Sequence, residues 1–155
     1  MPLKKLKEFR NRQTGVYVIS PQPPEDETIM FKIGRTIQMN KRLNAYHICF
    51  VDGFYIYKAI MLNNTYKTKT VVDKKRTLNK TIEIENFIHN QLESHRHKST
   101  TRRKHEWFSF TGELTEIDEV LIACHNKFKE DTEYPITEFS KRDFMTTFIQ
   151  MKLKK

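Results

Sequence analysis

The sequence has few cysteines and lacks long apolar segments and repeats. Its two cysteines, Cys49 and Cys124, lie far apart with no apolar leader before them, so we expect reduced, buried thiols and no disulfide framework. No run approaches the roughly eighteen apolar residues that a membrane span requires. With 155 residues and neither an internal repeat nor a low-complexity tail, the chain is expected to form one soluble, intracellular domain around one hydrophobic core.

Basic residues are in excess, and the excess is local. The 28 lysines and arginines outnumber the 19 aspartates and glutamates, which gives a net charge of +9. Residues 63–80 contain six basic residues and one acid, and residues 95–106 contain five and one, so these two polar, loop-like segments carry the whole excess. Two solvated loops would have the same composition, but a local positive field attracts polyanions, and we expect it to bind nucleic acid. The residues expected to contact the nucleic acid are Arg35, Lys67, Lys69, Lys74, Lys75, Arg76, Arg102, Arg103 and Lys104.

The pattern of apolar residues predicts three strands and four helices. The strand segments are rich in β-branched and aromatic side chains, and in the helical segments apolar residues recur every three to four positions. Asn40 and Thr81 are candidate N-caps of the first two helices. The predicted strands are residues 14–20, 29–35 and 53–62, and the predicted helices are residues 39–50, 81–95, 113–129 and 140–155.

Five residues of these elements together offer the groups that phosphodiester hydrolysis needs. Lys32 is unusual in an apolar strand, and alternation allows it to share one face of the sheet with Tyr17 on the strand before. Arg42 and Tyr46 are four residues apart on the first helix and therefore lie on one side of it. Glu85, on the second helix, offers a carboxylate. Such a set provides a base for water, cations for the phosphate and a metal ligand.

Motifs in the same residues resemble the GIY-YIG nuclease superfamily, and within it a branch associated with phages and viruses. "GVY" at residues 15–17 is similar to the first motif of the superfamily, and "KIG" at residues 32–34 is similar to the second, with lysine in place of a tyrosine. The "KIGRT" run and the Glu-Trp-Phe end of the basic segment, at residues 106–108, are typical of the phage and virus branch. One departure is the asparagine that the superfamily often carries late in the domain, which we do not place here. The residues that follow in the order and spacing of the superfamily are Arg42, Tyr46 and Glu85.

The resemblance implies a fold, a domain organisation and an activity. The fold would be α+β, with a three-stranded antiparallel sheet flanked by helices. The activity would be that of an endonuclease that uses one Mg²⁺ or Mn²⁺ to hydrolyse DNA, or RNA. The domain organisation would be an N-terminal segment at residues 1–13, a nuclease domain at 14–110 with a basic insertion at 63–80, and a C-terminal helical extension at 111–155 packed on the same domain.

The resemblance also implies a role for each site residue. Tyr17 would activate the attacking water. A tyrosine near its reference pKa of about 10 is almost entirely neutral at pH 7, and the positive charge of Lys32 would favour its anion. Arg42 would bind the scissile phosphate, while Tyr46 would orient the water or share the proton. Glu85 would hold the metal ion.

Four of the five site residues also have a purely structural interpretation. Tyr17 and Tyr46 are compatible with core aromatics, and Arg42 and Glu85 with solvated helix charges. His89, four residues after Glu85, is expected to help position that carboxylate.

The chain as a whole is compatible with two further functions. It could be a nucleic-acid-binding module of the same fold that does no chemistry. The acidic segment at residues 113–143 could instead be a docking surface for another protein.

Trp107 and Phe108 are expected to be core anchors and not platforms on which bases stack.

Overall fold

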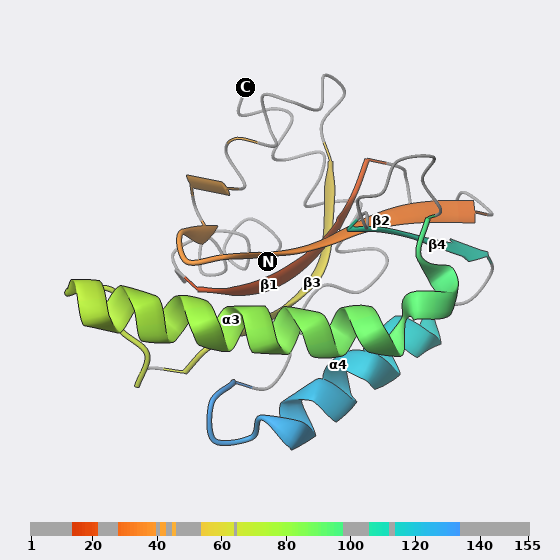
Figure 1. Ribbon diagram of the computed structural model, residues 1–155. Coiled ribbons are helices and arrows are strands. Elements are labelled where there is room, and N and C mark those ends of the chain that lie inside the picture. Colours follow the sequence, from red (N-terminus) through yellow and green to blue (C-terminus); the bar gives the residue numbers. More distant parts are fainter. Residues whose placement is uncertain are drawn as a thin grey trace, which may run out of the picture.

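A four-stranded antiparallel sheet organises the protein (Figure 1). The computed structural model describes residues 14–21, 28–39, 41–42, 45, 54–63, 65–97, 106–111 and 114–133. The order of the strands across the sheet is β3-β1-β2-β4. Their bounds are Gly15–Ser20 for β1, Thr28–Thr36 for β2, Tyr55–Met61 for β3 and Trp107–Thr111 for β4. The predicted α+β class is confirmed, and so are the first three predicted strands.

The fourth strand shows that the prediction of a three-stranded sheet is wrong. In β4, the buried Phe108 and Phe110 alternate with the half-buried Trp107 and Ser109, which is the two-residue period of a strand with one face in the core. The strand has only five residues, too few for this period to stand out from a pair of core aromatics. Phe108 is buried, as expected of a core anchor, whereas Trp107 is only partly buried.

Helix α3 (Val71–Gln91) begins ten residues before the predicted start at Thr81. Thr70 caps it, because its hydroxyl accepts the backbone N–H of Asp73 at 3.0 Å. Lysine and arginine are good helix formers, so the second half of the segment predicted as a basic loop is helical. Thr81 lies inside the helix, where its hydroxyl donates to the carbonyl of Leu78 at 2.7 Å.

The other helical elements follow the sequence more closely. Helix α4 (Thr115–Lys127) lies within the helix predicted at residues 113–129. A short 3₁₀ helix, η1 (Glu93–His95), follows α3. The described residues of the helix predicted at 39–50 are helical, and the helix predicted at 140–155 lies outside the described residues. Among the residues that the structure describes, no helix combines the length and apolar character of a membrane span.

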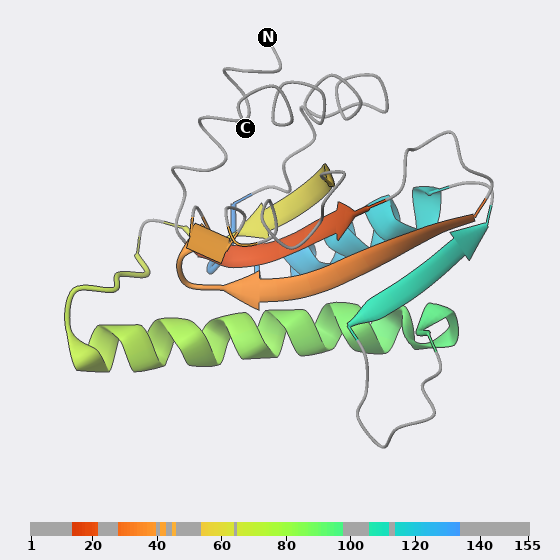
Figure 2. The ribbon, with the colours of Figure 1, turned by 90° about the horizontal axis from the view of Figure 1, so that it is seen from above.

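The hydrophobic core lies between one face of the sheet and the two longer helices (Figures 1 and 2). In Figure 2, α3 runs along the side of the sheet formed by β2 and β4. Each fully buried aliphatic or aromatic side chain contributes about 1.5–3 kcal/mol, so this contact holds α3 firmly in place. Core residues from the strands and helices include Val16, Val18, Phe31, Ile33, Ile84, Ile88, Ile117 and Leu121.

The sheet face opposite the core carries the predicted catalytic pair. Tyr17 lies opposite Gly34, and Ile19 lies opposite Lys32 in the β1–β2 register. Side chains alternate along each strand, so Tyr17 and Lys32 share this face, as the sequence allows.

Strand β2 is only half covered by β4. The register between the two strands ends at Lys32. Beyond it, the backbone N–H of Ile33 donates to the carbonyl of Glu106 at 2.9 Å, and the carbonyl of Ile33 lies 2.7 Å from Nε2 of His89 on α3. Helix α3 therefore approaches β2 where β4 has ended.

Candidate active site

A buried carboxylate, Glu85, lies where α3 approaches β2. Its side chain is 9% exposed, and its Oε1 lies 3.4 Å from Nε of Arg35. Its Oε2 is buried and has no hydrogen-bond partner among the described residues. Buried polar atoms nearly always have such a partner, so this oxygen marks Glu85 as a candidate functional group.

The electrostatic surroundings of Glu85 disfavour its charged form. Its pKa is raised to about 7, mainly by burial and also by the negative charge of Glu106, while the positive charges of Arg35, Lys32 and Arg96 oppose the shift. The three basic side chains therefore do not fully compensate the burial of this carboxylate. A further cation at Oε2 would stabilise the charged form.

Three polar side chains meet over Gly34, on the face of the sheet opposite the core. A β-carbon at position 34 would lie 2.7 Å from Cζ of Tyr17 and 3.2 Å from Oε2 of Glu106. The same Oε2 lies 3.4 Å from Nζ of Lys32. Only glycine leaves room for this arrangement, in which Tyr17 is 1% exposed.

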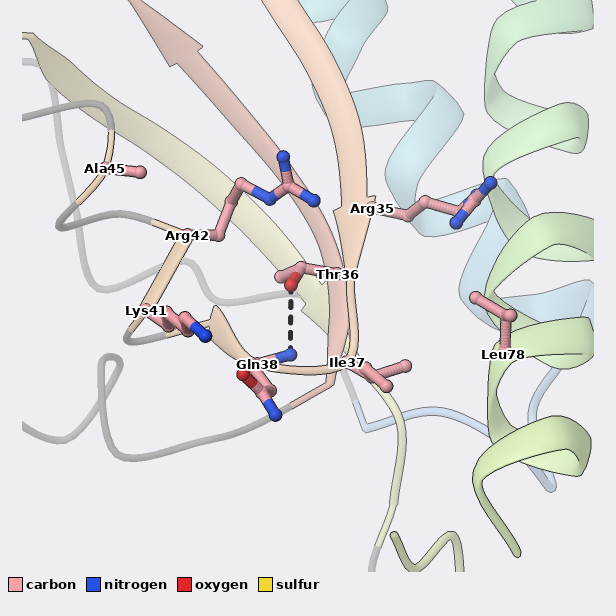
Figure 3. Close-up of a pocket in the computed structure, with 8 residues that line it drawn as sticks. All are labelled: Arg35, Thr36, Ile37, Gln38, Lys41, Arg42, Ala45 and Leu78. Carbon is pink, nitrogen blue, oxygen red and sulfur yellow. Dashed lines mark hydrogen bonds between the residues drawn. The ribbon is translucent and has the colours of Figure 1, made fainter. Parts of the chain in front are cut away.

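An open cavity of about 470 Å³ with a basic lining adjoins this cluster at the end of β2 (Figure 3). Its described lining includes three basic residues and no acid. Figure 3 shows the side chain of Arg42 pointing toward the strands and that of Arg35 pointing toward α3. Arg35 therefore links the cavity to Glu85. The lining residues are Arg35, Thr36, Ile37, Gln38, Lys41, Arg42, Ala45 and Leu78.

The first turns of α3 extend past the ends of the strands and carry much of the predicted nucleic-acid surface (Figures 1 and 2). Lys74 and Lys75 are exposed there. The guanidinium of Arg76 lies 4.6 Å from the ring centroid of Tyr66, so Arg76 also packs against the fold. Beside these basic residues, Val71 is 84% exposed and Val72 is 77% exposed.

Of the remaining residues predicted to be catalytic or to bind nucleic acid, some are described by the structure and others are not. Lys67 and Lys69 are exposed just before α3. Four predicted site residues lie outside the described residues: Tyr46, Arg102, Arg103 and Lys104.

His89 fixes α3 against β2, one helical turn after Glu85. Burial lowers its pKa, although its contact with the Ile33 carbonyl opposes this shift. The neutral ring donates from Nε2 to that carbonyl at 2.7 Å, and its ring centroid lies 5.1 Å from that of Phe108. This geometry fits the predicted role of His89 in positioning Glu85.

Glu106 is the site residue that the sequence analysis did not identify. In sequence it is one acid at the end of a basic segment, directly before a strand. Its position directly before a strand is the signal that could have identified it. A residue at the start of a strand lies beside the neighbouring strand with which that strand pairs. The structure brings it to Lys32 and Gly34, on a different strand.

Comparison with known proteins places the chain in a family. A family model described as the T5orf172 domain matches residues 14–125, which include all four strands, α3 and most of α4. No curated protein and no solved structure matches the chain. The match contradicts the assignment to the GIY-YIG nuclease superfamily, because T5orf172 is a distinct family. The chain belongs to the T5orf172 domain family.

Proposed function

We propose that the protein is a metal-dependent endonuclease that hydrolyses phosphodiester bonds in DNA. One observation carries this proposal: a buried carboxylate with an unpartnered oxygen, Glu85 Oε2, lies beside a cavity lined by basic residues. The cavity offers positive charge for a phosphate, and the carboxylate offers a ligand for a cation. The two are joined by Arg35, which contacts both.

Glu85 would be the ligand of one Mg²⁺ or Mn²⁺, although no group of three or more histidine, cysteine, aspartate or glutamate side chains that could hold a metal lies among the described residues. Hard divalent cations prefer oxygen ligands and keep several of their waters, and Glu85 provides a carboxylate oxygen that no other described group uses. When bound, the metal would polarise a phosphate oxygen and stabilise developing negative charge.

The other residues would act on the phosphate and on water. Arg42 and Lys41 would bind the phosphate in the cavity, where the planar guanidinium of Arg42 suits two phosphate oxygens. Tyr17 would take a proton from water at its Oη, and Lys32, on the same face, would favour the phenolate. Tyr46 would assist in orienting the water.

A second candidate function is a nucleic-acid-binding module that does no chemistry. It is favoured by the burial of Tyr17, which is 1% exposed, because a general base must reach the water that it activates. This candidate shares the basic surface with the first and differs in having no cleavage.

A protein-docking role for the acidic segment at residues 113–143 receives less support. Acids of this segment are used within the fold, since Asp118 lies 2.7 Å from Nζ of Lys58 and Asp131 accepts the hydroxyl of Tyr66. The docking surface and the intracellular location stay predictions.

Incubation with supercoiled plasmid tests the proposed function directly. We expect nicked or linear DNA with Mg²⁺ or Mn²⁺ and intact plasmid with EDTA, measured by gel electrophoresis. A single-stranded RNA in the same assay shows whether the activity extends to RNA. Absence of cleavage of every substrate with either metal would reject the endonuclease in favour of the binding module.

The basic surface of α3 is expected to contribute to DNA affinity through phosphate contacts. Replacing Lys74 and Lys75 by glutamine should weaken binding to all DNA sequences and reduce the slope of log affinity against log salt by up to about two, one for each phosphate that is no longer neutralised. Fluorescence anisotropy with a labelled duplex at several salt concentrations measures both quantities.

A matched pair of lysines on another helix provides the control. Lys127 and Lys129, at and just after the end of α4, are exposed and carry the same charge. Replacing both by glutamine should leave the slope nearly unchanged. Equal effects from the two pairs would mean that only net charge matters and that α3 forms no specific DNA surface.

A further inference from the structure

The first turns of α3, which extend past the sheet, are fixed to the rest of the fold (Figures 1 and 2). Thr77 is buried, and its hydroxyl donates to the carbonyl of Lys67 at 2.8 Å. The guanidinium of Arg76 lies over the ring of Tyr66, whose hydroxyl donates in turn to Asp131. These contacts hold the turns in one orientation, so a ligand would meet a preformed surface.

The buried Thr77 shows which side of these turns faces away from the fold. Successive residues of an α-helix are rotated by about 100°, which places four residues on the side away from Thr77. Val71 is 84% exposed and Val72 is 77% exposed, and Lys75 and Asn79 are exposed as well. Three of the four line an open hollow of about 410 Å³, so a ligand can reach them. We call this side the free face of α3: Val71, Val72, Lys75 and Asn79.

Positive charge lies on both sides of the free face. Lys74 and Arg76, the residues before and after the central Lys75, are exposed on its two flanks. Residues 67–80 contain six basic residues and one acid. That acid, Asp73, lies on the opposite side of the helix from Lys75 and is only partly exposed. A ligand of the free face would therefore meet cations at its two edges and valines between them.

The major groove of double-stranded DNA has the same arrangement of charge and apolar surface. The groove is about 12 Å wide and admits an α-helix, and a phosphate backbone runs along each of its two edges. Its floor carries the methyl groups of thymine, which apolar side chains contact, and the N6 and N7 atoms of adenine, which asparagine binds with two hydrogen bonds.

We propose that the free face of α3 reads A·T base pairs in the major groove of double-stranded DNA. Val71 and Val72 would contact thymine methyl groups, and Asn79 would bind adenine. Lys74 and Arg76 would each contact one of the two phosphate backbones. This inference rests on the DNA substrate of the proposed function, and it names the class of that DNA and its base preference.

The two valines distinguish base reading from general phosphate binding. Phosphate contacts need only the basic side chains and carry no sequence information. Valine is a poorer helix former than lysine or alanine, and two of them at exposed helical positions leave apolar surface in water. Contact with thymine methyl groups would bury this surface. An A-form RNA duplex would not allow that contact, because side chains cannot read its deep, narrow major groove.

Binding to three matched duplexes in EDTA tests the inference on the intact protein. The first duplex is DNA rich in A·T pairs, the second replaces each thymine by uracil and so lacks only the methyl groups, and the third is RNA of the same sequence. Fluorescence anisotropy at one salt concentration gives the affinities. We expect the thymine duplex to bind at least about fourfold more tightly than the uracil duplex, from one buried methyl group, and at least about tenfold more tightly than the RNA.

Variants of the free face identify the residues that read the bases. Val71→Ser combined with Val72→Ser should bind the thymine and uracil duplexes alike. Asn79→Ala should bind a duplex of 7-deazaadenine, which lacks the N7 acceptor, as well as the adenine duplex. Ile122→Ser is the control, because Ile122 is an apolar residue 38% exposed on α4, and it should keep the parental ratios. All the replaced side chains are exposed, and circular dichroism checks that each variant folds.

Three results would overturn the inference. Equal affinity of the parent for the thymine and uracil duplexes would mean that no methyl group is read. Discrimination that persists in the double-valine variant or in Asn79→Ala would place base reading elsewhere on the protein. An RNA duplex bound as tightly as the DNA would exclude the major groove.

The same assay separates this inference from the proposed function. A protein that prefers the thymine duplex through its valines but cleaves no nucleic acid would support the reading helix and reject the endonuclease. A protein that cleaves plasmid with Mg²⁺ but binds the thymine and uracil duplexes alike would support the endonuclease and reject the reading helix.

Discussion

Glu85→Gln is expected to lower the rate of metal-dependent cleavage at least about a hundredfold while leaving DNA affinity as strong as in the parent. The substitution conserves shape and removes only the negative charge that would hold the cation. A metal ion stabilises the transition state by several kcal/mol, and about 1.4 kcal/mol corresponds to a tenfold change in rate. Single-turnover cleavage of a labelled duplex, with affinity measured in parallel in Ca²⁺, separates the two effects.

Glu83 provides the matched control on the same helix. It lies two residues before Glu85, so the two side chains do not face each other. Its carboxylate is 59% exposed and lies 3.1 Å from Nζ of Lys80. Glu83→Gln should cleave at nearly the parental rate. A comparable loss from both substitutions would mean that the cation is held by another group.

The metal-free protein is expected to be destabilised by Glu85 as pH rises from about 4 to 8. The pKa of Glu85 is about 7 in the folded protein, above its ordinary value of 4.5. Between these values the folded state binds more protons than the unfolded state, so the contribution of Glu85 to stability is complete below pH 4.5 and is lost as pH rises through 7. The full loss is about 3 kcal/mol, at about 1.4 kcal/mol for each pKa unit.

Glu85→Gln isolates this contribution, because glutamine imitates the protonated carboxyl at every pH. With EDTA present, the variant should equal the parent near pH 4 and exceed its free energy of unfolding by up to about 3 kcal/mol at pH 8. Urea denaturation at four pH values measures the difference, and Glu83→Gln should follow the parent. Parallel curves of unfolding free energy against pH for the parent and Glu85→Gln would show that burial does not raise the pKa of this carboxyl.

Features that depend on local periodicity could be predicted from the sequence. Strands β1 and β2 follow from their alternating apolar residues, and α4 follows from its helical spacing. The common face of Tyr17 and Lys32 also follows from alternation, since both residues have the right parity in neighbouring strands. The beginning of α3 could not be read in this way, because its first ten residues carry mostly basic and polar side chains and no apolar stripe.

The positions of Glu85 and Glu106 beside β2 depend on tertiary contacts that the sequence pattern does not encode. Glu106 reaches the site only because β4 adds to β2 across a long sequence separation. Glu85 reaches it because α3 packs at the place where β4 ends. Neither residue has a local sequence pattern that predicts its contact with β2.

The incomplete cover of β2 has a consequence for how copies of this chain behave toward one another. An unpaired strand edge invites strands from other molecules and leads to aggregation. Here the ring of His89 donates to the carbonyl of Ile33, and the carbonyl of Glu106 accepts the backbone N–H of Ile33. The helix that carries the candidate metal ligand thus also shields this uncovered part of β2 from pairing with another copy.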